Sequence, residues 1–239
     1  MKRKLQSVTL KVFAIFFIGF NSCSQSLMFT VTIDSIGSDV RIGSRTYVLV
    51  PTMEDVKVTD LRFIEFANQI HKALSKKGYV KVDNPEEADI AIFVTYGIGN
   101  PQEHRYSYTL PVWGQTGVAS SSTSGNVYVF GNAATYSTNT THTPTYGIVG
   151  SNTYQGTYIT YFRYLKLDAF DLRKLRDEKQ ETQIWSTTVT STGSSDDLRL
   201  VFPYMIAACQ RYLGVNTGKK LSITLDQNDD SVYEYTRAK

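Results

Sequence analysis

The chain has 239 residues, with 25 basic and 22 acidic side chains, two cysteines and a formal net charge of +3. Four of the basic residues precede Cys23 with no acidic residue among them, so the chain from Cys23 onward carries 21 basic and 22 acidic side chains. A nucleic-acid-binding protein needs a basic surface to neutralise phosphates, and this balance excludes that class. Two cysteines are also too few for a disulfide framework.

The first 22 residues have the layout of a secretory signal peptide. Basic residues at positions 2–4 and 11 are followed by nine consecutive apolar residues at 12–20, and then by small and polar residues. A helix that spans a bilayer needs about 20 apolar residues, so this run is too short for a permanent anchor. The order of basic, apolar and small residues is typical of a cleaved signal. We predict a signal peptide over residues 1–22; the alternative is a buried N-terminal strand or helix.

The tetrapeptide FNSC at 20–23 resembles the lipobox of bacterial lipoproteins. The resemblance implies that Cys23 is diacylglycerated, carries palmitate and becomes the new N-terminus. The residue after the cysteine is Ser24 and not aspartate, which resembles the pattern of lipoproteins that are sorted to the outer membrane. The resemblance therefore implies an outer-membrane lipoprotein of the cell envelope facing the periplasm. Conventional cleavage near Ser24 or Ser26 stays open as an alternative.

The first half of the mature chain alternates strands with one helix. Residues 27–33 alternate apolar and polar side chains, so we predict an anchor segment and first strand over 23–44. Apolar residues recur at helical spacing from Leu61 to Leu74, with Gly78 after the last turn, which predicts a helix. Further strands are predicted at 45–51, 79–82 and 89–97.

A segment of 57 residues, between Arg105 and Arg163, contains no Asp, Glu, Lys or Arg. We predict a mobile loop at 112–125, a hairpin-like excursion at 126–141 and a long strand at 153–170. Low-complexity disorder is the compositional alternative. Seven tyrosines between 126 and 164 argue against complete disorder, because disordered segments are poor in aromatic residues.

The last part of the chain predicts a strand at 183–191, a second helix and a strand at 220–226. The second helix opens near Asp197, contains Pro203 and carries Cys209 on its apolar side as a buried, inert thiol. We therefore predict one α+β domain over 45–226, with insertion 106–162, followed by a flexible tail at 227–239. Its two helices would pack on one face of a mixed or antiparallel sheet.

Three stretches of this chain, YVKVDNPEEADIAIFVTYG, YFRYLKLDAFD and QIWSTTVTSTGSSDDLR, resemble bacterial lipoproteins of the domain-of-unknown-function forty-one thirty-six type. The similarity covers roughly residues 45–225, and the long charge-free insertion departs from a compact member. The matching positions are Ala88-Asp89, Asp168 or Asp171, and Trp185. They are structural positions, so the resemblance implies no particular activity.

Catalytic and metal-binding patterns fail in this sequence. The three histidines, His71, His104 and His142, are scattered, with no HExxH motif and no paired cysteine ligands, so we predict no metal and no cofactor. No GxSxG motif is present, and the acidic residues at 86–89 are typical of an exposed turn. We predict that the protein is not an enzyme.

Two binding functions fit the charge-free insertion. The first is a structural or assembly role through protein–protein binding or self-association, because a β surface without lysines does not block edge pairing. The second is a module that binds peptidoglycan or polysaccharide, with aromatic rings stacking on sugars. A surface segment whose tyrosines only pack on their own sheet is the third reading. The candidate binding surface consists of Trp113, Tyr128, Tyr136, Tyr146, Tyr154 and Tyr158.

Lipidation at Cys23 predicts a specific chemical result. The protein expressed in bacteria should partition into detergent and incorporate labelled palmitate, and Cys23→Ala should release it into the aqueous phase. Metabolic labelling with detergent partitioning measures both. A soluble wild-type protein that begins at Gln25 or Leu27 would contradict lipidation and leave export intact.

Overall fold

The structure is a computed structural model that describes residues 27–38 and 45–236; Cys23 and the predicted signal peptide lie outside this part of the chain. Its strands are β1 (Met28–Gly37), β2 (Thr46–Pro51), β3 (Val80–Lys81), β4 (Ile90–Ile98), β5 (Gln102–Phe130), β6 (Ala133–Asp171), β7 (Gln183–Gly193) and β8 (Leu221–Asp226). Its helices are α1 (Leu61–Ser75), α2 (Leu172–Glu178), α3 (Leu198–Cys209) and α4 (Asp230–Thr236), with short 3-10 helices at Pro85–Glu87 and Gln210–Tyr212.

The predicted α+β class is wrong. Of the described residues, 55% lie in strands and 23% in helices, in a mostly β structure with an eight-stranded mixed sheet and four helices. The reason is the insertion, because residues 112–125, predicted as a mobile loop, continue β5 as extended strand. Thr and Tyr favour extended backbone, and hydrogen bonding to a long partner strand outweighs the turn preference of the scattered Gly and Asn residues.

The sheet has the strand order β3-β2-β4-β6-β7-β1-β8, and β5 pairs with β6 outside this path. β2 runs parallel to β3 and β4, whereas the β4–β6, β6–β7, β7–β1 and β1–β8 pairs are antiparallel. The parallel pairing of β2 with β3 and β4 requires a crossover, and α1 supplies it. Only the last nine residues of β6, from Arg163 onward, pair with β4.

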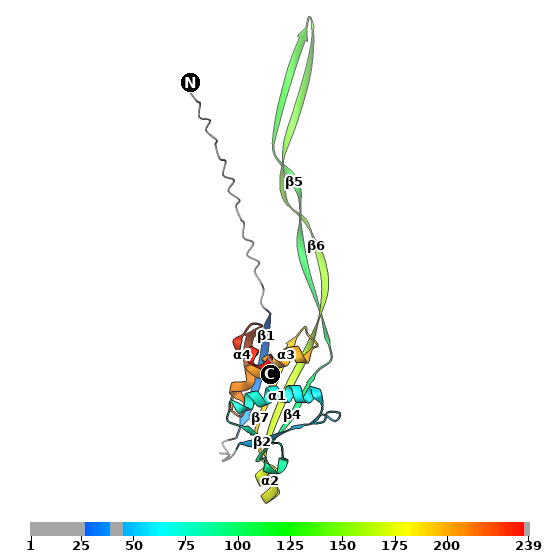
Figure 1. The fold of residues 1–239 in the computed structure, drawn as a ribbon. Helices are drawn as coiled ribbons and strands as arrows, with labels where there is room; N and C mark the ends of the chain where they lie inside the picture. The colour runs from blue at the N-terminus through cyan, green and yellow to red at the C-terminus, as the bar shows by residue number, and fades with distance from the viewer. Residues whose placement is uncertain (1–26, 39–44, 237–239) are drawn as a thin grey trace, which may run out of the picture.

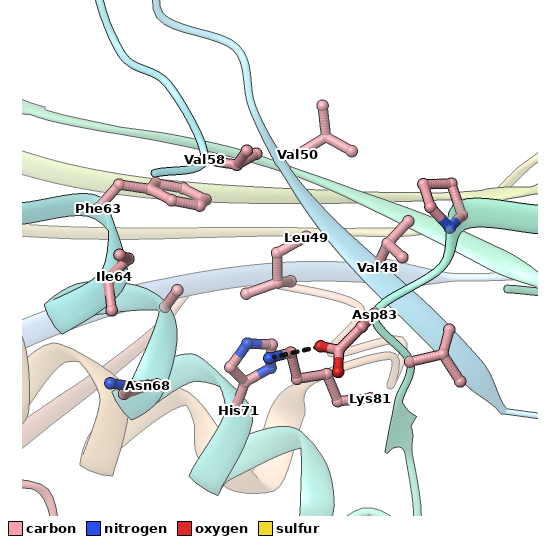
Figure 2. Close-up of a pocket in the computed structure, with 13 residues that line it drawn as sticks. Val48, Leu49, Val50, Val58, Phe63, Ile64, Asn68, His71, Lys81 and Asp83 are labelled. Atoms are coloured by element: carbon pink, nitrogen blue, oxygen red, sulfur yellow. Dashed lines mark ion pairs between the residues drawn. The ribbon is translucent and has the colours of Figure 1, made fainter. Parts of the chain in front are cut away.

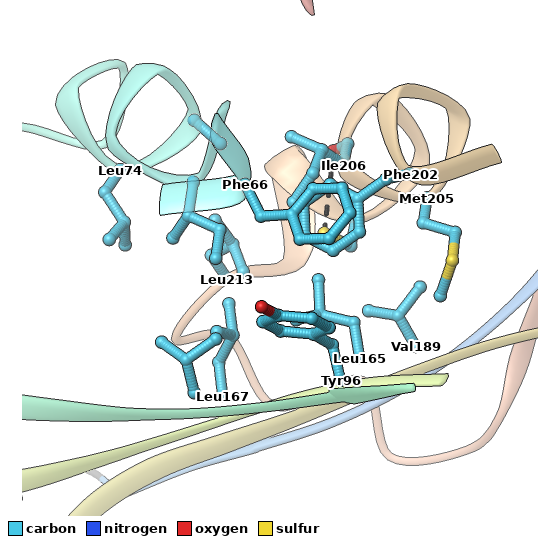
Figure 3. Close-up of a cluster of buried hydrophobic side chains, with 14 of the residues drawn as sticks. Phe66, Leu74, Tyr96, Leu165, Leu167, Val189, Phe202, Met205, Ile206 and Leu213 are labelled. Atoms are coloured by element: carbon cyan, nitrogen blue, oxygen red, sulfur yellow. Dashed lines mark hydrogen bonds between the residues drawn. The ribbon is translucent and has the colours of Figure 1, made fainter. Parts of the chain in front are cut away.

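α1 and α3 pack over the same face of this sheet and bury its apolar side (Figure 3). Phe66 of α1 stacks on Phe202 of α3 with ring centroids 4.2 Å apart, and Tyr96 of β4 meets Phe66 edge-on at 4.8 Å. Cys209 of α3 is fully buried, which confirms the predicted burial, and burial raises the pKa of its thiol to about 12. Pro203 is the sixth residue of α3, so the helix continues through it without the amide that would bond to the carbonyl of Arg199.

Residues 102–160 form a two-stranded hairpin that projects far from the rest of the described chain, which we call the body (Figure 1). β5 is 29 residues long, which at about 3.3 Å per residue corresponds to about 95 Å. Its tip is the two-residue turn Gly131-Asn132, with φ of +60° at Gly131. A positive φ at the first turn position fits a type II′ turn, whose twist matches that of the paired strands.

Other segments also differ from their predicted structure. Residues 230–236 were predicted within a flexible tail, but they form α4, with Val232 and Tyr235 buried against the core. The predicted strand at 153–170 is the end of the longer β6. Residues 172–178 form α2, in which Asp171 accepts hydrogen bonds from the amides of Arg173 and Lys174 as the N-cap.

No residue from 102 to 162 belongs to the buried core of the described chain, so the body should fold without the hairpin. Replacing residues 106–156 with Asn-Gly would join Arg105 to Thr157, which face each other across the two strands. We expect cooperative thermal unfolding with a midpoint within a few degrees of the parent, measured by circular dichroism. As a control, Leu167→Ala in the core should reduce the free energy of unfolding by about 2–5 kcal/mol. Loss of the cooperative transition in the hairpin deletion would contradict this assignment.

Candidate functional site

The hairpin is the most exposed part of the structure and has two open edges. Among the described residues, β5 pairs with β6 alone, so the outer edge of β5 and the hairpin part of β6 offer unpaired backbone groups to solvent. An isolated two-stranded ribbon is at best marginally stable in water. The hairpin therefore has both the hydrogen-bonding capacity and the energetic reason to receive further strands.

The base of the hairpin is fixed to the body by Arg163. Its side chain is buried, and its Nε and Nη2 atoms donate hydrogen bonds to the carbonyl oxygen of Ser195 at 3.0 and 2.7 Å. Burial lowers the pKa of this guanidinium. Gly193 lies against it, and a Cβ at that position would approach within 3.1 Å. These contacts join the start of the body part of β6 to the loop that precedes α3.

Aromatic rings cover one face of the half of the hairpin nearer to the body. Tyr108 stacks on Tyr154 of the opposite strand with ring centroids 5.5 Å apart, and His104 stacks on Tyr158 at 4.9 Å. Tyr106 connects the two pairs, at 6.2 Å from Tyr108 and 6.1 Å from Tyr158. Cross-strand aromatic pairs contribute about 0.2–1 kcal/mol each, so this ladder supplies stability that the hairpin lacks from any core.

The structure places all six residues of the predicted binding surface on the hairpin, each between 45% and 70% exposed, but it does not gather them into one site. Only Tyr154 and Tyr158 join the aromatic ladder. Trp113 lies opposite Ile148 beside a break in strand register. The predicted binding surface did not include His104, Tyr106 and Tyr108. Their spacing of two residues places all three side chains on one face of a strand, and this pattern could have identified them.

The body also has a pocket of about 330 Å³ between α1 and the edge of the sheet at β2 and β3 (Figure 2). Its lining is mainly apolar, with Asn68, His71, Lys81 and Asp83 as the polar groups (Figure 2). Lys81 and Asp83 form an ion pair of 3.1 Å at an exposed position, where such pairs contribute little. This size and lining fit the lower end of small-ligand sites.

The one titratable ring of this pocket is held neutral. Burial lowers the pKa of His71 to about 4; the positive charge of Lys81 adds to the decrease and Asp83 opposes it. Burial also raises the pKa of Tyr47, so its hydroxyl stays protonated, and it shares a hydrogen bond of 2.7 Å with Nδ1 of His71. With this pKa, His71 is a poor general base near pH 7.

Within residues 27–38 and 45–236, no group of three or more His, Cys, Asp or Glu side chains could hold a metal ion. In the same ranges, none of the helices has the length and apolar character needed to cross a membrane.

No protein-family model and no curated protein matches the chain. Among solved structures, the chain is similar to a PDZ domain protein from Parabacteroides distasonis, with 11% sequence identity and a TM-score of 0.37. The alignment covers 82% of this chain and 38% of that protein, so this chain spans well under half of the length of its structural neighbour.

The neutral His71 predicts a loss of stability in acid. The unfolded chain binds this proton near pH 6.5 and the folded chain near pH 4, so lowering the pH through this window favours the unfolded state. The free energy of unfolding should fall by at most about 3 kcal/mol, and less to the extent that solvent screens the ring. His71→Gln should remove this part of the pH dependence in urea unfolding, whereas Asn68→Ala in the same pocket should retain it. An unchanged pH dependence in His71→Gln would contradict a buried neutral imidazole.

Proposed function

We propose that this protein is a non-enzymatic cell-envelope protein with a structural or assembly role, which binds another protein chain along the edges of its hairpin. The observation that carries the proposal is the hairpin itself, a 29-residue strand and its partner that leave the body with both edges open. Addition of a strand to an exposed edge is a common mode of protein recognition, in which backbone hydrogen bonds supply affinity.

The surface chemistry of the hairpin supports this mode of binding. Natural proteins protect exposed edges with charged side chains, above all lysine, and residues 106–162 contain none. Within the hairpin itself the charged residues are Glu103 and Arg105, which form an ion pair of 3.2 Å with each other. Beyond Arg105 no charged side chain has to lose its hydration when another strand binds. The free-energy cost of desolvating charges is therefore absent from this association.

The attachment to the envelope is proposed from the N-terminal sequence alone. A lipid on Cys23 would hold the chain at a membrane surface, and only a short segment, residues 24–27, separates Cys23 from the start of β1. The body would then lie close to the membrane. The hairpin, about 95 Å long at about 3.3 Å per residue, could reach partners far from that surface.

The geometry favours protein over glycan as the ligand of the hairpin. Sugar rings bind by stacking on the flat faces of aromatic side chains, and in the ladder these faces are turned toward neighbouring rings, as in the Tyr108–Tyr154 stack with an interplanar angle of 20°. Trp113 is 67% exposed but has no aromatic neighbour among the described rings with which to form a platform. Glycan retention is therefore an outcome to be tested and not the expected one.

The test compares partner crosslinking in intact cells for four forms of the full chain. The parent should give crosslinked protein complexes, and the Asn-Gly replacement of residues 106–156 should give none. Ser122→Lys with Asn126→Lys, which places charges on one strand of the outer hairpin, should lose most of the complexes. Trp113→Ala should keep them. Complexes that survive the hairpin replacement, or retention on peptidoglycan that is lost in Trp113→Ala, would contradict the proposal.

A further inference from the structure

We propose that the partner of the hairpin is a second copy of this chain, and that copies join side by side, edge to edge, through the outer half of the hairpin. This inference rests on the proposed function, because it names the partner of the same surface. The outer half consists of Ser120–Phe130 of β5 and Ala133–Thr143 of β6, which face each other in eleven consecutive cross-strand pairs.

The hairpin divides into two parts that differ in their readiness for edge pairing. Between Val112 and Ser120 the register shifts three times, and Pro111 and Pro144 lie in the same middle region. Bulges and prolines interrupt a hydrogen-bonding edge and are devices that block its extension. The outer half contains no bulge, no proline and no charged residue. Edge pairing is therefore available there and hindered in the middle region; nearer to the body, Glu103 and Arg105 place charges on β5.

The sequence of the outer half favours its own copy as the occupant. Its end, NVYVF at 126–130, combines high β propensity with no charge and no proline, which is the signature of segments that pair with themselves. Val127, Val129 and Phe130 are 61%, 67% and 78% exposed, with no core to cover them. Between this apolar tip and the middle of the hairpin both strands are rich in Ser and Thr. When two copies lie with tip beside tip and Ser/Thr-rich zone beside Ser/Thr-rich zone, the apolar residues of one tip are buried against those of the other.

This matching determines the direction of neighbouring copies. If two hairpins point the same way, the apolar tips lie together and the Ser/Thr zones lie together, whereas opposed hairpins would place each tip against a polar zone. With all tips in one direction and every copy turned the same way, the β5 edge of one copy meets the β6 edge of the next, and this contact is antiparallel; a β5–β5 contact between such copies would be parallel, which is slightly less stable per residue. Each copy then uses two different edges, so the contact is heterologous and can close into a ring in which no outer edge stays unpaired.

The size of one contact supports a ring over a dimer. Eleven residues at about 3.3 Å each and a sheet about 10 Å thick give about 360 Å² per edge, or about 720 Å² per contact. A stable dimer buries about 1,200–2,000 Å², so one contact is too small. A copy held at both edges has contacts that total about 1,400 Å², which reaches that range.

Variants of the full chain with one added cysteine each test this arrangement. Ser124 of β5 and Asn139 of β6 face each other within one hairpin, so each is replaced in a separate chain and no disulfide can form inside one molecule. Co-expressed Ser124→Cys and Asn139→Cys chains should form a mixed disulfide dimer after oxidation, because a disulfide requires Cα atoms within about 7 Å. Ser137→Cys and Thr141→Cys, on the same face of β6, determine the register. The parent chain, which already contains Cys23 and Cys209, is the control for disulfides that involve these two residues.

The outcomes separate the alternatives. Disulfide dimers in Ser124→Cys alone would show a β5–β5 contact and overturn the proposed pairing of β5 with β6. Equal yields for Ser107→Cys mixed with Gln155→Cys, a facing pair in the half near the body, would overturn the assignment to the outer half. An absence of mixed disulfide dimers, with a monomer in sedimentation of the detergent-solubilised chain, would overturn self-association.

A charged variant gives an independent measurement. Ser122→Lys with Asn126→Lys should decrease the assembled fraction at least tenfold in sedimentation, while the thermal midpoint of the body stays within a few degrees of the parent. An unchanged assembled fraction would overturn the assignment. If this variant loses crosslinks to other proteins and the parent is a monomer, the self-association fails and the proposed function stands. If the Asn-Gly replacement still self-associates and still forms crosslinks to other proteins, both the self-association and the proposed function are contradicted.

Discussion

The rest of the structure depends on one backbone ladder, the pairing of β6 with its neighbours along its whole length. β6 is a single strand of 39 residues whose last part lies between β4 and β7 in the sheet and whose first part pairs with β5 in the hairpin. Because the strand is continuous, the hydrogen bonds that hold it in the body also set the direction of the hairpin. Arg163, bonded to the carbonyl of Ser195, marks the point where the strand passes from one environment to the other.

The two environments obtain their stability in different ways. In the body, two helices cover one face of the sheet, and side chains such as Leu165 and Phe202 are fully buried, so the hydrophobic effect dominates. The hairpin has no such core. Its order relies on cross-strand pairs, including Tyr106, whose ring lies over Gly156 so closely that a Cβ there would meet it at 2.6 Å. A segment stabilised only in this way gains more from added strands than the body does.

The distribution of charge matches this division. Ion pairs such as Arg199–Glu65 and Lys166–Asp168 lie on the body, while the hairpin beyond Arg105 has no charged side chain. Charges keep surfaces apart through desolvation and repulsion, and this barrier to association is absent along one long ribbon. The pocket at α1 and β2 lies on the body, lined by the Lys81–Asp83 ion pair and by His71, whose pKa is lowered by burial to about 4.

The sequence by itself determined the local elements of the body and the unusual chemistry of the insertion. The helical spacing from Leu61 to Leu74 specified α1, alternation specified β1 and β8, and the uncharged 57 residues were visible directly. Only the tertiary structure decided that the insertion is one hairpin, because its register comes from long-range pairing and its Ser/Thr-rich strands have no buried face to impose a pattern. For the same reason α4 and the His71 pocket were not predicted: Val232, Tyr235 and Tyr47 take their roles from neighbours distant in sequence.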